Sequence, residues 1–272
     1  MSKYEWVDLY KSVRAPEAFY KAYQKKLDVV DERYLIEFIK NHRPRTEKVI
    51  VDLGIGPGRE LEWIDGLDDV KTIIGVDFSK PMLDFCKNIA KKYLKRIVLI
   101  QEDFRDLNKT KKVIKDRAIP AIFICLVNTL GNFPHRDRLK VLRVVRRVMK
   151  KDDRLVLMLY KLPRDMRIDG TALKRIPSHL RPKGYDIMKY LELIDYSFQN
   201  WIWDPVVEIF GSPPIITYDE DSQDIAAYVG EKKVFGSHRW SMGEIRKLHK
   251  EANLKIDRMI EGDYAYVVVS KK

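Results

Sequence analysis

The sequence predicts an α/β fold, in which a sheet of parallel strands is closed by an antiparallel hairpin at the C-terminus. Between residues 48 and 160, short apolar and β-branched runs alternate with stretches of helical periodicity. This alternation is typical of repeated βαβ units. Near the C-terminus, two further apolar runs flank Glu-Gly-Asp at 261–263, which is typical of a hairpin turn.

Residues 49–58 join a strand to a glycine-rich turn. The β-branched run 49–51 suits a buried parallel strand, and Asp52 closes it. A helical pattern follows over 58–66. Strand, turn and helix together form a nucleotide-binding βα unit, because glycine lets the backbone approach a ligand closely. The glycines of the turn are Gly54, Gly56 and Gly58.

The other elements follow from the same patterns. Ser79 and Ser241 are predicted helix N-caps, and Glu244 lies at the capping-box position after Ser241. Further strands are expected at 72–77, 97–101, 121–126, 154–160, 254–260 and 264–270, and helices at 80–94, 136–150 and 241–252.

Two segments lie outside this alternating core. Residues 1–45 are rich in aromatic residues and contain one or two amphipathic helices over 17–40, which predicts a helical cap. Residues 161–239 are too many for a simple connection, so we expect an α+β insertion that faces the substrate. The core is then 46–160 and 240–272. Within the insertion, a basic stretch precedes an aromatic one, which is typical either of RNA binding or of a lid with its own small core.

Composition bounds the class of protein. The net charge of +12 and pI of about 9.4 suit a polyanionic partner such as RNA, or a Lys/Arg-rich surface with no such role. Charged residues make up 34% of the chain and glutamines number only four, which suggests a thermophilic source. No apolar run approaches the ~18 residues of a membrane span. We expect a cytoplasmic protein whose Cys86 and Cys125 are reduced and buried.

Three segments, at 52–58, 75–83 and 101–107, resemble the successive motifs of class I S-adenosylmethionine (SAM) methyltransferases. The resemblance implies their Rossmann-like fold, with SAM as cofactor. Asp77, about 20 residues after the glycine turn, is placed to bind ribose hydroxyls. The alternative is a Rossmann dehydrogenase, whose glycines usually follow Gly-x-Gly-x-x-Gly. Here they follow Gly-x-Gly-x-Gly, and Asp103 has no standard role in dehydrogenases.

The resemblance also implies roles for individual residues. Asp52 holds the amino group of SAM, Asp77 the ribose, and Asp103 the adenine amine. Tyr20 or Tyr23 is placed to contact the methionine end, with packing on the sheet as the alternative for either. The predicted cofactor residues are Tyr23, Asp52, Gly54, Gly56, Gly58, Asp77, Phe78, Met82, Asp103, Phe104 and Leu126.

The acceptor side is set by residues 126–134, after the fourth strand. They resemble the corresponding loops of glycine/sarcosine and histidine-betaine-forming N-methyltransferases, and lack the Pro-Pro of amino-base methyltransferases. The resemblance makes Asn128, Asn132 and Phe133 the catalytic candidates: Asn128 accepts from an amine and Phe133 stacks a planar acceptor. No metal-ligand spacing is present, so we expect no metal.

The leading hypothesis is a SAM-dependent N-methyltransferase that modifies RNA by direct SN2 transfer to an exocyclic base amine, such as a cytidine N4 of archaeal ribosomal RNA. One alternative is an N-methyltransferase of small amines or amino acids, to which the loop also points. The other is a SAM-binding assembly factor without transfer activity. RNA binding should weaken steeply with salt, whereas small-amine activity should not.

Overall fold

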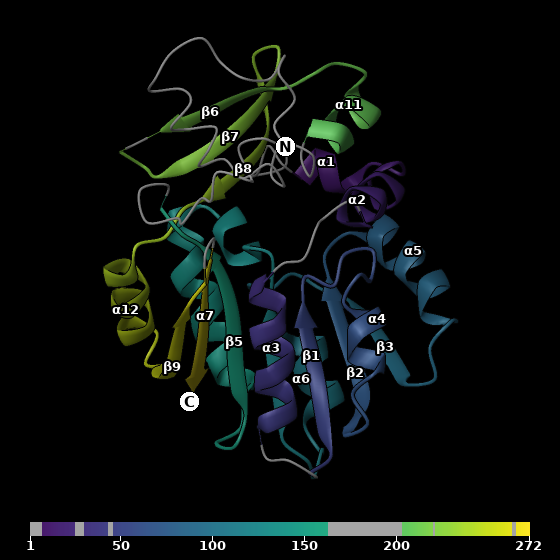
Figure 1. Cartoon of the computed structure of the whole chain (residues 1–272), viewed down its shortest axis with the longest axis vertical. Coiled ribbons are helices and arrows are strands. Elements are labelled where there is room, and N and C mark those ends of the chain that lie inside the picture. The colour runs from purple at the N-terminus through teal and green to yellow at the C-terminus, as the bar shows by residue number, and fades with distance from the viewer. Residues whose placement is uncertain (1–6, 25–29, 43–45, 163–202, 220, 263–264) are drawn as a thin grey trace.

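The computed structural model describes residues 7–24, 30–42, 46–162, 203–219, 221–262 and 265–272. Its centre is a seven-stranded sheet in the order β3-β2-β1-β4-β5-β10-β9 (Figure 1). The strands are β1 (Lys48–Leu53), β2 (Val70–Asp77), β3 (Arg96–Gln101), β4 (Ala121–Cys125), β5 (Arg154–Tyr160), β9 (Lys255–Glu261) and β10 (Ala265–Lys271).

Strands β1 to β5 are parallel, and β10 runs antiparallel between β5 and β9. The predicted α/β fold with its C-terminal antiparallel hairpin is therefore confirmed. Strand order reverses at β1, which pairs with β2 on one side and β4 on the other. In open parallel sheets, ligands bind at the carboxyl ends of the strands beside such a reversal.

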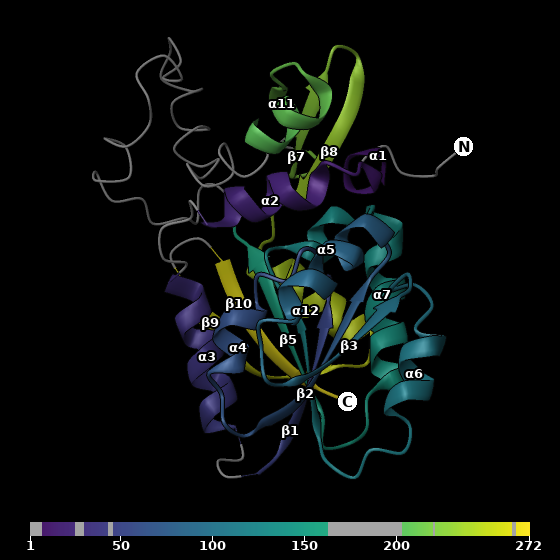
Figure 2. The same ribbon diagram turned by 90° about the vertical axis from the view of Figure 1, so that its right-hand side faces the viewer.

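Helices cover both faces of this sheet (Figure 2). Apolar side chains of α3, α4 and α5 share one hydrophobic cluster, and those of α6, α7 and α12 share the other. The sheet is thus buried on both sides, as parallel sheets require. Their bounds are α3 (Val30–Asn41), α4 (Leu61–Asp65), α5 (Lys80–Ala90), α6 (Asn108–Ile114), α7 (His135–Val148) and α12 (Met242–Glu251).

Both predicted N-caps are present. The Ser79 hydroxyl accepts a hydrogen bond from the Met82 N–H at the start of α5. The Ser241 hydroxyl accepts from the Glu244 N–H at 3.2 Å. The capping box is not completed as predicted, because the Glu244 carboxylate contacts His238.

The N-terminal segment divides between two places. Helices α1 (Val7–Lys11) and α2 (Ala15–Gln24) lie above the carboxyl edge of the sheet, where they contact α5 (Figure 2). Helix α3 instead packs on the face of the sheet, near β10. The predicted cap therefore consists of α1 and α2, and α3 belongs to the core layer.

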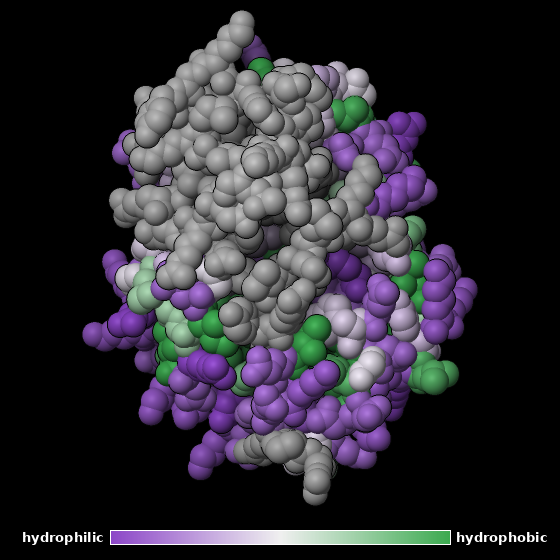
Figure 3. All heavy atoms as spheres, viewed as in Figure 1, coloured by the Kyte–Doolittle hydropathy of each residue, from purple (hydrophilic) through white to green (hydrophobic). Residues whose placement is uncertain are grey.

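The described part of the predicted insertion contains α11 (Asp204–Phe210) and a three-stranded antiparallel sheet of β6 (Ile215–Asp219), β7 (Asp224–Val229) and β8 (Lys232–His238). Residues 163–202, with most of the basic and aromatic stretch, lie outside the described residues. Hydrophilic side chains cover most of the described surface on the face shown in Figure 3. Within the described ranges, no helix has the length and apolar character needed to cross a membrane.

Candidate active site

A cavity lies at the carboxyl edge of the parallel strands, where several chain segments meet. It is bounded by α1, the glycine turn after β1, the end of β2, the first turn of α5 and the loops after β3 and β4. The position is the one that the strand order predicts for a ligand site. The lining residues are Tyr10, Gly54, Ile55, Gly56, Pro57, Glu60, Asp77, Phe78, Met82, Phe104, Leu126, Val127, Thr129, Asn132 and Phe133.

The glycine turn is shaped by left-handed backbone conformations and by close packing. Gly54 has φ +97°, and a Cβ there would lie 2.9 Å from Thr129 Cγ2. Gly58 has φ +87°, and a Cβ there would lie 2.7 Å from Cys86 Sγ on α5. Both positions therefore require glycine. Gly54 and Gly56 line the cavity, whereas Gly58 holds the turn against α5.

Asp77 lies at the cavity wall, with both carboxylate oxygens held by backbone. Its Oδ2 accepts from the Gly56 N–H at 3.0 Å, and its Oδ1 accepts from the Ser79 N–H at 2.8 Å. Burial raises the pKa of Asp77 to about 6, and these backbone hydrogen bonds oppose the rise. The carboxylate is thus fixed in orientation, with lone pairs left for a ligand hydroxyl.

Asp52, at the end of β1, is 2% exposed, and among the described residues its Oδ2 has no hydrogen-bond partner. Burial, followed by the nearby charges of Glu60 and Asp77, raises the pKa of Asp52 well above its usual value. The nearest counterion is Arg59, whose guanidinium lies 3.3 Å from Glu60. In the part of the chain that the structure describes, Asp52 thus has two acidic neighbours and one arginine, a balance that favours a positively charged ligand.

This charge distribution tests the predicted cofactor. SAM carries a sulfonium and an ammonium, which suit Glu60 and Asp77 in the cavity wall. Asp52, which was predicted to hold the amino group, is buried close to both and does not itself line the cavity. A dinucleotide pyrophosphate is anionic, and burying it beside these carboxylates would be strongly unfavourable. The residues present therefore fit SAM and argue against the dehydrogenase alternative.

The predicted adenine side is only partly assembled. Phe78, Met82 and Phe104 line the cavity as expected, together with Leu126. Asp103 does not, because its Oδ1 accepts from the Arg105 N–H and from Arg105 Nε, each at 2.9 Å. Partial burial acts to raise the pKa of Asp103, but the hydrogen bonds from Arg105 outweigh it, so that the pKa lies below its usual value. The structure thus pairs Asp103 with Arg105 and does not bring it to the cavity.

Among the described side chains, Tyr10 is the tyrosine that lines the cavity, and it comes from the aromatic-rich N-terminal segment. Its ring stacks on Phe19 at 5.2 Å between centroids and meets Phe78 edge-on at 6.2 Å. Tyr20 packs against Phe85 on α5 and does not line the cavity. Tyr23 lies in α2, but its side chain is outside the described residues.

The loop after β4 is strained. Val127 and Asn128 both have left-handed backbones, with φ of 50° and 57°, immediately before the short 3₁₀ helix at Thr129–Asn132. A β-branched residue in this conformation is a rare outlier, and such strain is concentrated at functional sites. Here it turns the chain so that Val127 and Thr129 line the cavity while Asn128 points away from it.

The structure corrects the predicted role of Asn128. Its side chain is fully buried, and its Nδ2 donates to Ser237 Oγ at 2.8 Å and to the His238 carbonyl at 2.7 Å. Its Oδ1 accepts from the Tyr160 N–H at 3.1 Å and from Trp240 Nε1 at 2.9 Å. Every donor and acceptor site of the amide is used within the protein, so Asn128 fixes the loop and leaves no group for an acceptor.

Asn132 and Phe133, the other two predicted catalytic residues, do line the cavity. The Oδ1 of Asn132 is buried and has no hydrogen-bond partner among the described residues. The Phe133 ring lies 5.8 Å from that of Phe104 and inclined to it by 49°. A buried amide oxygen without a partner costs free energy, which a ligand N–H would recover.

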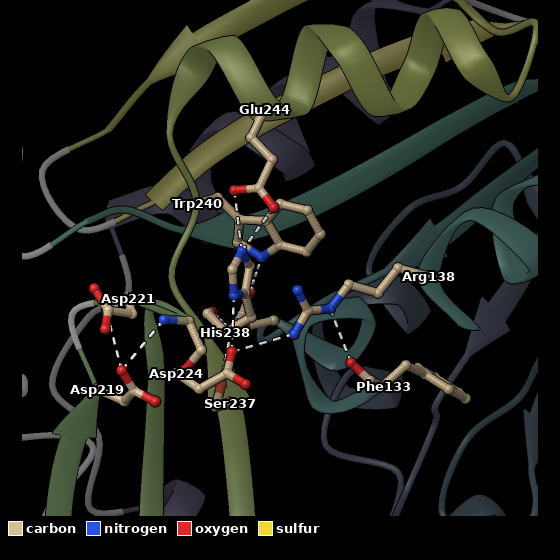
Figure 4. Close-up of polar contacts among 11 residues, drawn as sticks. Phe133, Arg138, Asp219, Asp221, Asp224, Ser237, His238, Trp240 and Glu244 are labelled. Atoms are coloured by element: carbon tan, nitrogen blue, oxygen red, sulfur yellow. Dashed lines mark hydrogen bonds and ion pairs between the residues drawn. The ribbon is translucent and has the colours of Figure 1, made fainter. Parts of the chain in front are cut away.

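Behind this loop lies a buried polar network that sequence reasoning missed (Figure 4). Arg138 Nε donates to the Phe133 carbonyl at 2.8 Å, and its Nη2 lies 3.2 Å from Asp224 Oδ1. The ring of His238 bridges Asp224 at 2.8 Å and Glu244 at 2.9 Å. The network ties α7, β7, β8 and α12 to the acceptor loop, and no local sequence pattern signals it.

Comparison with known proteins agrees with this geometry. Residues 50–152 match the family model described as a methyltransferase domain. No curated protein matches the chain. Solved structures similar in fold include a S-adenosylmethionine-dependent methyltransferase from Clostridium acetobutylicum ATCC 824. The two sequences are 12% identical, the alignment covers 91% of this chain and 93% of that chain, and the TM-score is 0.55.

Two further solved structures share the fold. The CcbJ methyltransferase from Streptomyces caelestis has 14% identity, covers 92% of this chain and 94% of its own, and has a TM-score of 0.59. The PH0226 protein from Pyrococcus horikoshii OT3 has 17% identity, covers 89% and 91%, and has a TM-score of 0.53. The domain match, the strand order and the cation-favouring cavity point to one class. Residues 50–152 match a methyltransferase domain, and the chain has the fold of class I SAM-dependent methyltransferases.

Proposed function

We propose that this methyltransferase transfers a methyl group to a nitrogen, and that the acceptor is an exocyclic amine of an RNA base. The observation that carries the proposal is the buried Asn132 Oδ1, which has no partner among the described residues and belongs to a residue that lines the cavity. An amide oxygen in this position accepts an N–H, which selects an amine over a carbonyl or thioether.

In this proposal, Asn132 orients the amine and Phe133 stacks the planar ring that bears it. Bound SAM supplies a methyl group on a positively charged sulfur. That chemistry would be displacement of the methyl group onto the amine nitrogen oriented by Asn132, with the demethylated sulfur compound as leaving group and the amine proton passing to solvent. Such a reaction is accelerated mainly by positioning, so that rigid walls rather than a strong base are required.

The choice of RNA rests on charge. The chain carries a net +12, and exposed arginines and lysines are concentrated on α7, directly after the acceptor loop. A base amine also presents a flat aromatic ring, which suits the neighbouring Phe104 and Phe133 rings. The second candidate is a small amine, supported by the resemblance of residues 126–134 to small-amine N-methyltransferases.

Transfer of labelled methyl from SAM to fractionated cell extract tests the proposal. The fractions are large RNA, transfer RNA, protein and small molecules, taken from a strain that lacks the gene. Label in RNA, traced by nuclease digestion to an N-methylated nucleoside, is the expected result. Label only in small molecules would replace the RNA substrate with the amine, and label on carbon or oxygen would remove the role of Asn132.

A further inference from the structure

Helix α7 carries a row of exposed cations that begins just after the acceptor loop. Spacings of four, three and four residues place them on one face of the helix, opposite the apolar side chains that pack on the sheet. Among the described residues, no carboxylate forms an ion pair with any of the four. The row consists of Arg136, Lys140, Arg143 and Arg147.

This row lines a groove of about 530 Å³ between α7 and the end of α12. Glu251 is the acid in its wall, and its carbonyl accepts from Arg143. A second depression of about 460 Å³ adjoins it at Asn253 and contains Arg246, Lys250 and Lys255. We call the first of these, lined by Arg136, Lys140, Arg143, Arg146 and Arg147 along α7, the basic groove.

We propose that the basic groove binds the phosphodiester backbone of the RNA substrate, an inference that rests on the proposed function. From Arg136 to Arg147 the helix rises about 16 Å, at 1.5 Å per residue. At the 3.4 Å per nucleotide of one strand of duplex DNA, that length spans about five phosphates, and a comparable number in RNA. A regular row of cations matches a regular row of phosphates, and phosphate contacts fix register without reading sequence.

The groove starts at the edge of the cofactor cavity. Asp137, beside Arg136, lies 3.4 Å from Arg105, which in turn holds Asp103. Pro134 and His135 alone separate Arg136 from the cavity residue Phe133. A strand that places one base beside Phe133 can therefore continue directly over α7.

The chemistry of the groove favours RNA over a membrane surface. Helices that bind membranes need an apolar face beside their cations. In the described part of the chain, the exposed large apolar side chains lie elsewhere, and α7 and α12 contribute none of them. They are Val13, Leu94, Val113, Val207 and Ile215.

Fluorescence anisotropy of a labelled RNA hairpin of about 20 nucleotides, titrated with the full chain at about 50 to 200 mM salt, tests the proposal. The groove variant is R136Q/K140Q/R143Q/R147Q. The matched control, K87Q/K91Q/K92Q/R96Q, removes four exposed cations in and after α5, on the opposite face of the sheet. Methyl transfer to RNA is measured separately for all three proteins.

We expect the groove variant to bind at least about tenfold more weakly, and its slope of log affinity against log salt to be shallower by about 3. The control should keep the wild-type slope. Equal losses of RNA affinity in both variants would overturn the proposed role of the basic groove. Binding of the protein to anionic lipid vesicles but not to RNA would also overturn it. Wild-type RNA methylation by the groove variant would reject the groove and keep the proposed function. If RNA binding depends on the basic groove but none of the three proteins methylates RNA, the groove is kept and the proposed function is rejected.

Discussion

Asp77 illustrates how burial prepares a side chain for a ligand. Its pKa is raised to about 6 in the folded protein, so its contribution to stability is fully present below about pH 4 and is lost as the pH rises through about 6. Two pKa units correspond to about 3 kcal/mol. We expect Asp77→Asn to flatten this part of the pH profile in urea unfolding of the cofactor-free protein. An unchanged profile would mean that Asp77 is not the titrating group.

Asn128 contributes to stability. Asn128→Ala leaves several buried partners without hydrogen bonds, including Trp240 Nε1 and Ser237 Oγ. Unsatisfied buried groups cost about 1–3 kcal/mol each, so we expect a loss of roughly 3 kcal/mol in the free energy of unfolding. Denaturant unfolding measures it, with exposed Asn88→Ala as the control. Wild-type stability would restore the acceptor role that the sequence predicted.

Asn132 shows the opposite behaviour, because its Oδ1 has no internal bond to lose among the described residues. We expect Asn132→Ala to keep the wild-type stability and SAM affinity and to lower methyl transfer about 100-fold, the effect of a misoriented acceptor. Calorimetry with SAM and the labelled-methyl assay separate the two effects. Full transfer by this variant would remove Asn132 from the acceptor site.

The elements around the loop depend on the buried network of Figure 4. Arg138 joins α7 to β7 through Asp224, and to the acceptor loop through the Phe133 carbonyl. We expect Arg138→Ala to destabilise the protein by about 1–3 kcal/mol, because it leaves the Phe133 carbonyl without its donor and leaves Asp224 with His238 alone. Arg143→Ala, on the exposed face of the same helix, should change stability by less than about 0.5 kcal/mol.

Thermal unfolding with and without ligands checks the Arg138 prediction further. If the network positions the loop, a milder variant, Arg138→Lys, should still bind SAM but lose transfer. Similar losses from Arg138→Ala and Arg143→Ala would show that the network has no special role.

For the whole molecule, the acidic cavity predicts selective stabilisation by a cation. SAM at 100 times its Kd should stabilise the folded protein by about 2.7 kcal/mol. NAD at the same concentration should give no increase in the unfolding temperature, because its pyrophosphate would meet Glu60 and Asp77 in the cavity wall. Thermal unfolding with each ligand measures both, and Asp77→Ala should lose most of the SAM effect. Equal stabilisation by NAD would contradict the charge argument.

Local pattern was enough to predict the sheet, its strand ends and the glycine turn. These features depend on periodic burial within one strand, or on contacts between successive motifs at a fixed spacing, such as Gly56 with Asp77, 21 residues further on. Motif spacing likewise placed Asp77, Phe78 and Met82 at the cavity.

Tertiary structure alone decided that Asn128 stabilises the loop while Asn132 lines the cavity. Four residues apart and chemically identical, they differ because Asn128 meets Ser237, His238 and Trp240 from a segment more than 100 residues away. The same holds for Tyr10, brought to the cavity by α1, and for the pairing of His238 with Glu244 and Asp224. Hydrogen-bond partners from distant segments leave no periodic trace in the sequence, and they determine which polar side chain remains available to a substrate.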